Sequence, residues 1–137
     1  HRIHAAIDGF IHEMFYIPGT LYPENNLAVS NIPSLFTRNE RLITLLKHEK
    51  LGSVAVIKVG ATIVGKIKVK YDSTESNVKP KIIHKKYEPI FSKKGEELGL
   101  FEMGSTVILL FEPKKIFLEN LNVGQEIRLG EIIATIS

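Results

Sequence analysis

The sequence predicts an all-β domain built from short strands and many turns. Short stretches of apolar and β-branched residues recur along the chain, and turn-forming dipeptides such as Asp8-Gly9 and Pro18-Gly19 separate them. The 137 residues fit a single domain, because domains commonly contain about 100–150 residues. A composition of 44% apolar and 24% charged residues is ordinary for a globular domain and excludes a disordered or collagen-like chain.

The first half of the chain contains the clearest strand signals. Residues 7–29 mix β-branched and aromatic residues with turn formers, which favours short strands joined by turns over a helix. Two apolar stretches between Arg41 and Tyr71 flank residues 48–52, so we expect a β-hairpin in which Gly52 takes a positive φ. The second arm alternates as a half-buried strand requires, through Val54, Val56, Ile63, Ile67 and Val69.

Two glycines and a lysine-rich stretch modify this pattern. Gly60 and Gly65 interrupt the second arm, and we expect β-bulges or a close approach of another backbone there. Residues 72–97 combine turn formers with six lysines, which predicts a long surface loop with at most one short strand.

The C-terminal part returns to apolar stretches. They run from Leu98 to Phe111, around Gly104-Ser105-Thr106, and again through residues 122–137, where Gly124 and Gly130 stand at nearly regular spacing between short strand-like stretches. The last pattern is typical of half of a lipoyl-like barrel-sandwich. We therefore predict an all-β, short-stranded barrel-sandwich with a lipoyl-like C-terminal half and a long surface loop.

Composition limits the chemistry and the partners. The absence of cysteine excludes a disulfide framework, a thiolate metal site and a cysteine nucleophile. A net charge of +3 favours anionic partners, either acidic lipid or nucleic acid. No apolar run approaches the roughly 20 residues that span a bilayer, so we expect no transmembrane helix and no signal peptide. Because the chain begins at His1 inside a strand-like motif, we expect it to be a portion of a longer product.

The histidines and lysines suggest two kinds of site. His1 and His4 lie three positions apart and could contribute to a zinc site with His12, His48 and His84. Residues three apart on a strand face opposite sides, so we favour surface or hydrogen-bonded histidines and expect no metal. The lysines of residues 72–97 could bind nucleic-acid phosphates. Beyond Tyr87 and Phe91, however, no aromatic residues are interleaved with them to stack on bases, so we favour a solvated basic segment.

The triplet Gly104-Ser105-Thr106 places a hydroxyl beside an unhindered peptide carbonyl. That arrangement suits intramolecular attack, although a Gly-Ser pair in a strand is more commonly a bulge. Several further motifs accompany the triplet, so we favour a role in intramolecular attack over a simple β-bulge.

In several separated places, and in the family's order, the sequence resembles the phosphatidylserine decarboxylase family of the pyruvoyl-dependent bacterial and mitochondrial type. His1-Arg2-Ile3-His4 resembles the family's HRxH motif. Further blocks are similar to family motifs at residues 19–21, 31–36, 38–41 and 59–65, and residues 101–107 resemble the F-x-x-G-S-T-V processing motif. Met103 stands where bacterial members often have leucine. The resemblance extends to about Pro113.

The resemblance implies that the chain is a proenzyme that cuts itself between Gly104 and Ser105 and forms a pyruvoyl cofactor from Ser105. His4 is then the base that activates the Ser105 hydroxyl, and His1 is the acid of the catalytic cycle. Residues 1–137 form one catalytic domain, in which 1–104 match the family's β-chain and 105–137 its α-chain. Family members carry an upstream membrane-contacting region and an aspartate that assists maturation, and Asp8, which follows the HRxH motif, does not match that aspartate.

The implied reaction is the decarboxylation of phosphatidylserine to phosphatidylethanolamine through a Schiff base with the pyruvoyl group. The implied partners are phosphatidylserine, an anionic membrane surface, the chain's own second fragment and a possible homodimer, with no nucleic acid. The implied location is peripheral, at a bacterial or mitochondrial inner membrane. Two alternatives stay open. One is a non-enzymatic lipoyl-like interaction domain, which would require a lysine flanked by Met or by Asp and Ala that the sequence lacks. The other is a basic nucleic-acid-binding β-barrel.

Overall fold

The computed structural model describes residues 1–77, 81–104 and 106–137. Two short helices accompany the strands, α1 (Asn26–Asn31) and α2 (Leu35–Arg38). The strands are β1 (Arg2–His4), β2 (Gly9–Ile17), β3 (Arg41–His48), β4 (Gly52–Val59), β5 (Ile67–Val69), β6 (Ile83–Ser92), β7 (Glu97–Phe101), β8 (Thr106–Phe111), β9 (Ile116–Leu118) and β10 (Ala134–Ile136). The all-β prediction is confirmed.

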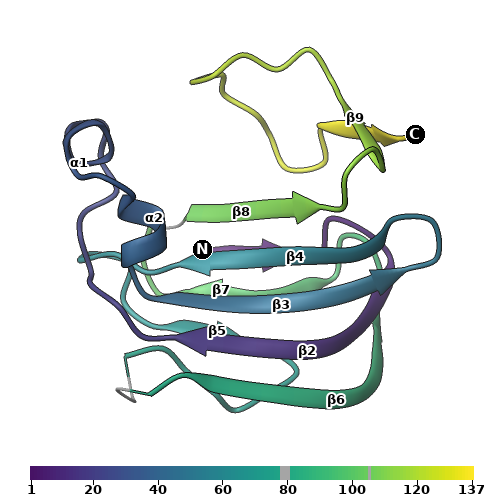
Figure 1. Cartoon of the computed structure of the whole chain (residues 1–137), viewed down its shortest axis with the longest axis horizontal. Helices are drawn as coiled ribbons and strands as arrows, with labels where there is room; N and C mark the ends of the chain where they lie inside the picture. The colour runs from purple at the N-terminus through teal and green to yellow at the C-terminus, as the bar shows by residue number, and fades with distance from the viewer. Residues whose placement is uncertain (78–80, 105) are drawn as a thin grey trace.

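The strands form two larger antiparallel sheets and one strand pair. The five-stranded sheet has the order β6-β2-β3-β4-β8, the three-stranded sheet has the order β1-β7-β5, and β9 pairs with β10. Figure 1 shows the five-stranded sheet face on, with the three-stranded sheet behind it. The sheets remain separate, so the described residues form no closed barrel.

The core lies between the two larger sheets. Alternate residues of each strand point inward, because successive side chains on a strand face opposite sides. The five-stranded sheet contributes Met14, Leu42, Leu46 and Val56, and the three-stranded sheet contributes Ile3, Ile67, Leu98 and Phe101. The two sheets therefore hold each other through apolar side chains that are far apart in the sequence.

The predicted hairpin is confirmed in its first part. β3 and β4 pair from Arg41↔Val59 to His48↔Gly52, and Gly52 has a φ of 69°. The second arm does not continue to Ile63, which is largely exposed. After Val59 the chain leaves the five-stranded sheet, and it enters the three-stranded sheet at Ile67.

The prediction of a long surface loop over residues 72–97 is wrong. This segment contains the ten-residue strand β6, which pairs with β2 at the edge of the five-stranded sheet. Its lysines suit an edge strand, since charged side chains there oppose pairing with another chain. Lys85, for example, binds Asp72 at 2.9 Å.

Two other segments also differ from the expected pattern. Residues 7–29 contain one nine-residue strand, β2, and the start of helix α1, whose first turn is capped by the Asn25 side chain accepting from the Ala28 backbone N–H. In residues 122–137, Gly124 and Gly130 take a positive φ in turns, and β10 is the one strand. The lipoyl-like pattern therefore contains fewer strands than its spacing predicts.

Candidate active site

The processing motif lies where the chain passes from one sheet to the other. Phe101 ends β7 in the three-stranded sheet, and Thr106 begins β8 in the five-stranded sheet. Gly104, between them, has a φ of 57°, a left-handed conformation that residues with a side chain rarely adopt. Ser105, the predicted nucleophile and cofactor precursor, lies outside the described residues. The residue before the predicted cleavage site therefore has a backbone conformation that favours glycine.

The loop between β4 and β5 holds the segment before Gly104. The Met103 N–H donates to the Val64 carbonyl at 2.8 Å, and the Glu102 N–H donates to the Lys66 carbonyl at 3.1 Å. Gly65 permits this approach, since a Cβ there would lie 2.9 Å from the Glu102 Cβ. The close backbone approach predicted at Gly65 is thereby confirmed.

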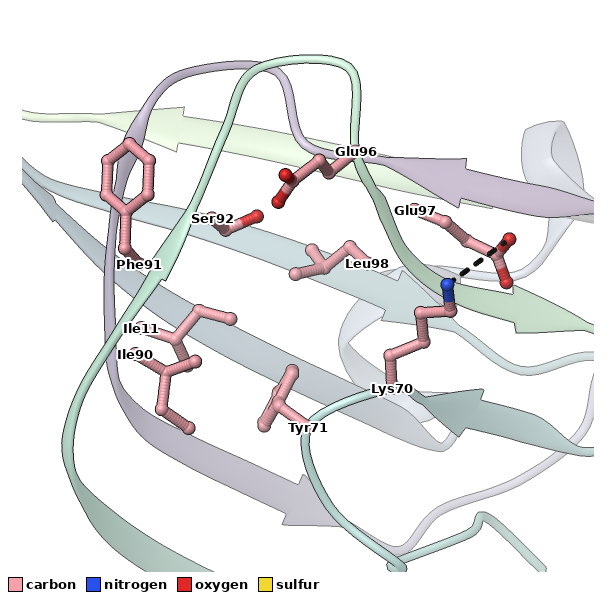
Figure 2. A pocket seen from close by; sticks show the side chains of 9 residues that line it. All are labelled: Ile11, Lys70, Tyr71, Ile90, Phe91, Ser92, Glu96, Glu97 and Leu98. Carbon is pink, nitrogen blue, oxygen red and sulfur yellow. Dashed lines mark ion pairs between the residues drawn. The ribbon is translucent and has the colours of Figure 1, made fainter.

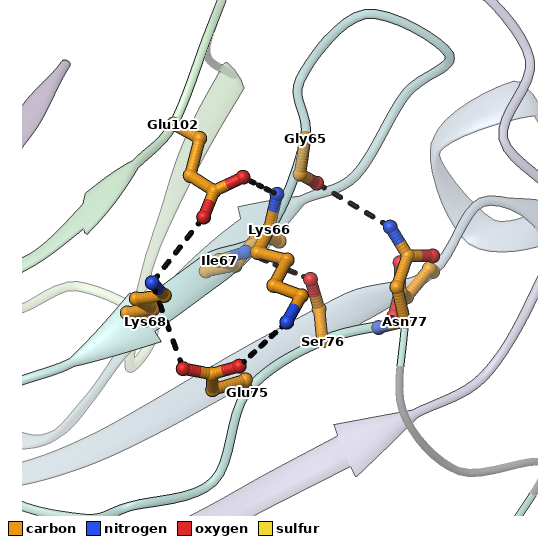
Figure 3. Close-up of polar contacts among 9 residues, drawn as sticks. Gly65, Lys66, Ile67, Lys68, Glu75, Ser76, Asn77 and Glu102 are labelled. Atoms are coloured by element: carbon orange, nitrogen blue, oxygen red, sulfur yellow. Dashed lines mark hydrogen bonds and ion pairs between the residues drawn. The ribbon is translucent and has the colours of Figure 1, made fainter.

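Charged side chains tie the same loop to its neighbours (Figure 3). The Glu102 carboxylate binds the Lys68 ammonium at 3.2 Å and accepts from the Lys66 backbone N–H at 3.3 Å. These contacts lower the pKa of Glu102, with the Lys66 backbone N–H as the larger cause. Glu75 binds Lys66 at 3.0 Å and Lys68 at 3.6 Å. Both lysines are therefore paired with carboxylates.

Asn39 joins three of the motif blocks. Its fully buried side chain accepts from the Tyr22 backbone N–H and from the Thr20 hydroxyl, both at 3.0 Å. It also donates to the carbonyls of Tyr22 at 2.8 Å and Gly60 at 3.0 Å. One side chain thus connects the block at 19–21 with the blocks at 38–41 and 59–65.

Glu40 is a buried carboxylate next to this junction. One oxygen accepts from the Tyr16 hydroxyl at 2.7 Å and from the Asn77 backbone N–H at 2.5 Å. Burial, and then the hydrogen bond to Glu40, raises the pKa of Tyr16. A Cβ at Gly60 would lie 3.1 Å from the other Glu40 oxygen, and the Gly60 N–H donates to the Glu40 backbone carbonyl at 2.8 Å.

Glu24 contacts the processing motif directly, and sequence reasoning missed it. Its carboxylate accepts a hydrogen bond from the hydroxyl of Thr106, the residue after Ser105. The second oxygen, Oε1, is buried and has no hydrogen-bond partner among the described residues. Burial raises the pKa of Glu24, and the Thr106 hydrogen bond opposes this effect. No local signal links two residues that lie so far apart in the chain.

The structure places His4 at the end of β1, the strand that borders β7, and His1 just before the start of β1. The His1 backbone nitrogen donates to the Phe101 carbonyl at 3.0 Å, and the Phe101 N–H donates to the His1 carbonyl at 2.7 Å. His1 is therefore close to the segment that leads to Gly104. His4 pairs with Glu97 at the other end of β7, and the register shifts between Ile3 and His4. This irregularity is the kind of bend that two histidines three apart would need to face one side.

Comparison with known proteins identifies the family. A family model described as phosphatidylserine decarboxylase matches residues 1–135. The chain belongs to the phosphatidylserine decarboxylase family. The resemblance of the motif blocks is thereby confirmed, and hydrogen bonds join four of them, at residues 19–21, 38–41, 59–65 and 101–107.

Relatives in the decarboxylase family are named phosphatidylserine decarboxylase proenzyme. The Brevibacillus brevis protein is 42% identical over 98% of this chain and 49% of its own length. The Myxococcus xanthus protein is 46% identical over 100% of this chain and 49% of its own length, and the Pseudoalteromonas atlantica protein is 38% identical over 100% and 50%. The chain spans about half the length of the curated relatives it matches.

Two of the other histidines of this decarboxylase-family chain, His48 and His84, have structural contacts, whereas the buried Nδ1 of His12 has no hydrogen-bond partner among the described residues. His48 accepts from the Lys50 and Leu51 backbone N–H groups in the β3–β4 turn. His84 binds Glu13 at 2.9 Å and stacks on Phe15. Across the part of the chain that the structure describes, no three His, Asp or Glu side chains gather into a metal-binding group. None of the described helices is long and apolar enough to cross a membrane.

A cavity of about 440 Å³ opens between the two sheets at the other end of β7 (Figure 2). Its apolar lining includes Ile11, Ile90 and Leu98, and Lys70 and Glu97 form an ion pair at its edge at 3.9 Å. Because Glu97 begins β7 and Gly104 follows its end, this cavity lies away from the processing motif.

Proposed function

We propose that this chain carries the catalytic domain of a pyruvoyl-dependent phosphatidylserine decarboxylase, which converts phosphatidylserine to phosphatidylethanolamine. The observation that carries the proposal is the family match over residues 1–135, which includes the processing motif. The name proenzyme, given to the relatives, supports activation by cleavage. No observation on the described residues favours the lipoyl-like or the nucleic-acid-binding alternative.

The proposed maturation begins with attack of the Ser105 Oγ on the Gly104 carbonyl carbon. The hydroxyl proton passes to a base, the peptide C–N bond breaks, and the released nitrogen takes up a proton, which leaves an ester and a free amine. Loss of the Ser105 α-proton then breaks the ester bond to the Ser105 side chain, which releases the Gly104 carboxylate and leaves dehydroalanine at position 105. Hydrolysis of this dehydroalanine consumes one water and releases ammonia. The product is a pyruvoyl group at position 105. The left-handed Gly104 fits this chemistry, because the nearest atoms that the described residues bring to where its Cβ would be, from Val64 and the Ile63 carbonyl, lie 3.6–3.9 Å away.

Cleavage at this bond would produce fragments 1–104 and 105–137. All six residues of β8 pair with β4, from Thr106↔Val59 to Phe111↔Val54. This ladder supports the view that the shorter fragment remains bound to the longer one, as the partner chain that the resemblance implies.

His4 is the proposed base in maturation, and His1 is the proposed acid in turnover. A serine hydroxyl is a weak nucleophile near neutral pH and needs a base. In the mature protein the pyruvoyl carbonyl would bind the substrate amine and accept the electrons left by carbon dioxide, so a proton donor must act on the substrate carbon. The backbone hydrogen bonds between His1 and Phe101 support a role for His1 near the segment that leads to Gly104. His4 pairs with Glu97 at the other end of β7, and its assignment rests on the family resemblance.

Phosphatidylserine is a bilayer lipid, so the proposal includes peripheral association with a bacterial or mitochondrial inner membrane. The names of the relatives support a phospholipid substrate. A homodimer also remains a proposal.

The decisive experiment measures fragment masses and carbon dioxide release together. We expect a C-terminal fragment that starts at position 105, contains 137 − 104 = 33 residues and resists Edman chemistry at its blocked amino terminus. Ser105→Ala should yield one uncut chain and no carbon dioxide from phosphatidylserine, while Ser73→Ala, at an exposed turn, serves as the matched control. Unchanged carbon dioxide release by Ser105→Ala would overturn the proposal.

A further inference from the structure

The two carboxylate oxygens of Glu24 differ in their contacts. Oε2 accepts from the Thr106 hydroxyl, whereas Oε1 is buried and has no hydrogen-bond partner among the described residues. Buried polar atoms are normally hydrogen-bonded, and leaving one unpaired costs about 1–3 kcal/mol. A donor that reached Oε1 from a ligand would remove this cost, so Oε1 is suited to binding such a donor.

The charge of Glu24 makes a cationic donor the best match. The ion pairs of the described residues include no lysine, arginine or histidine that binds Glu24. Arg38, which reaches the segment before Glu24, donates instead to the Tyr22 hydroxyl at 2.9 Å and lies over the Tyr22 ring. A cationic donor would therefore satisfy both the unpaired oxygen and the uncompensated charge.

Glu24 lies beside the position at which the proposed cofactor forms. Thr106, its hydrogen-bond donor, follows Ser105 in the chain and begins β8. Pairing with Val59 of β4 fixes the backbone of Thr106. Figure 1 shows the helices that follow Glu24 at the same end of the sheet as the start of β8. The carboxylate is thus held at the residue next to position 105.

The substrate of the proposed reaction presents a cation that must lose a proton. The primary amine of phosphatidylserine is an ammonium group near neutral pH, and a protonated nitrogen has no electron pair with which to bond to a carbonyl carbon. A base must therefore act on the amine before it can react. Burial raises the pKa of Glu24, which brings its carboxyl group closer to the neutral range in which a base exchanges protons effectively.

We propose that Glu24 binds the ammonium group of the phospholipid substrate and takes up its proton during turnover. One N–H bond breaks, its electron pair stays on the nitrogen, and the proton forms an O–H bond with Oε1. The inference rests on the proposed function and adds a residue that acts on the amine of the substrate, whereas His1 is proposed to act on its carbon. The Glu24 side chain is half-buried in the uncut chain, and cleavage after Gly104 would open the connection next to Thr106 to the headgroup.

The first test replaces Glu24 with glutamine in the full chain. Glutamine keeps an acceptor for the Thr106 hydroxyl, so fragments 1–104 and 105–137 should form at the parental rate on a denaturing gel. Glutamine has no charge and takes up no proton, so carbon dioxide release from phosphatidylserine vesicles should fall about 10²- to 10⁴-fold. Glu88→Gln removes an exposed carboxylate of β6, and this matched control should release carbon dioxide like the parent.

A second test replaces the substrate amine with hydroxylamine. Hydroxylamine is largely unprotonated near neutral pH and needs no base before it reacts with a carbonyl group. Its addition to the 105–137 fragment, measured as an increase in mass, should be equally fast in the parent and in Glu24→Gln. Trapping of phosphatidylserine on the same fragment by cyanoborohydride should be at least about tenfold slower in Glu24→Gln. These masses report on the amine step without depending on the release of carbon dioxide.

Three results would contradict this role of Glu24 alone. Parental carbon dioxide release by cleaved Glu24→Gln would overturn the inference. A loss of cleavage in Glu24→Gln would also overturn it, because the charge would then act in maturation. Equal slowing with hydroxylamine and with phosphatidylserine would do the same, since a distorted site slows both. No carbon dioxide from the cleaved parent would instead reject the proposed function, and the inference with it.

Discussion

Replacing Lys58 with methionine tests how the five-stranded sheet accommodates a buried lysine. Lys58 is completely buried on β4, and its ammonium donates to the Thr44 hydroxyl at 2.7 Å and to the Val56 carbonyl at 3.1 Å. The ion pairs of the described residues include no carboxylate partner for it. Burial lowers the pKa of Lys58 to about 7. Methionine has a similar length and no charge, so it preserves the packing and removes the ionisable group.

The expected gain follows from the two protonation states. Lys58 has a pKa of 10.5 in the unfolded chain and of about 7 in the folded chain. The free energy of unfolding of the wild type therefore rises with pH between about 7 and 10.5. Below about pH 7 it is lowered by the full cost of burying the charged ammonium. At about 1.4 kcal/mol for each pH unit, the penalty is about 5 kcal/mol. The methionine variant also loses the two hydrogen bonds of the Lys58 ammonium, which offsets about 2 kcal/mol of the gain. Lys58→Met should therefore stabilise the fold by about 3 kcal/mol near pH 6, and the gain should vanish near pH 9.

Urea unfolding of both proteins at about pH 6 and about pH 10 measures this difference. Lys47→Met, which removes an exposed lysine from the adjacent strand β3, is the control and should show no such pH dependence. A stability difference between wild type and Lys58→Met that stays constant with pH would refute the reasoning, because it would mean that Lys58 keeps its charge in the folded state.

Three further predictions concern the motif blocks and their contacts. Glu24→Leu removes the acceptor of the Thr106 hydroxyl and should slow cleavage about tenfold on a denaturing-gel time course, while Glu24→Gln keeps an acceptor and should cleave normally. Asn39→Ala leaves buried groups unpaired and should lower the free energy of unfolding by about 2–4 kcal/mol in urea titrations. His4→Ala should block cleavage, whereas His1→Ala should cleave but release carbon dioxide about 10²- to 10⁴-fold more slowly.

Each of these has a contrary result. Equal cleavage rates for Glu24→Leu and Glu24→Gln would remove the role of the Thr106 contact. An unchanged urea midpoint for Asn39→Ala would mean that the motif blocks hold together without it. Normal cleavage by His4→Ala would reject His4 as the base, and full turnover by cleaved His1→Ala would reject His1 as the acid.

Local pattern was sufficient for part of the fold and for the family. The β3–β4 hairpin could be predicted because side-chain alternation and the turn glycine Gly52 act over neighbouring residues. The motif blocks identified the family in the same way, since each is a short run that can be recognised without knowing where it lies in space.

Tertiary structure decided what depends on distant partners. β6 is a strand because β2, which precedes it by many residues, supplies its backbone hydrogen bonds, and its lysine-rich composition resembles that of a loop. Alternation along β4 places Lys58 with Val54 and Val56 on the inner face, but only the adjacent strand shows that Thr44 receives its ammonium. The contacts of Glu24 with Thr106 and of Asn39 with Gly60 likewise exist only after the sheets have packed. A hydrogen bond needs both of its atoms within about 3 Å, and the order of residues along the chain does not contain that distance.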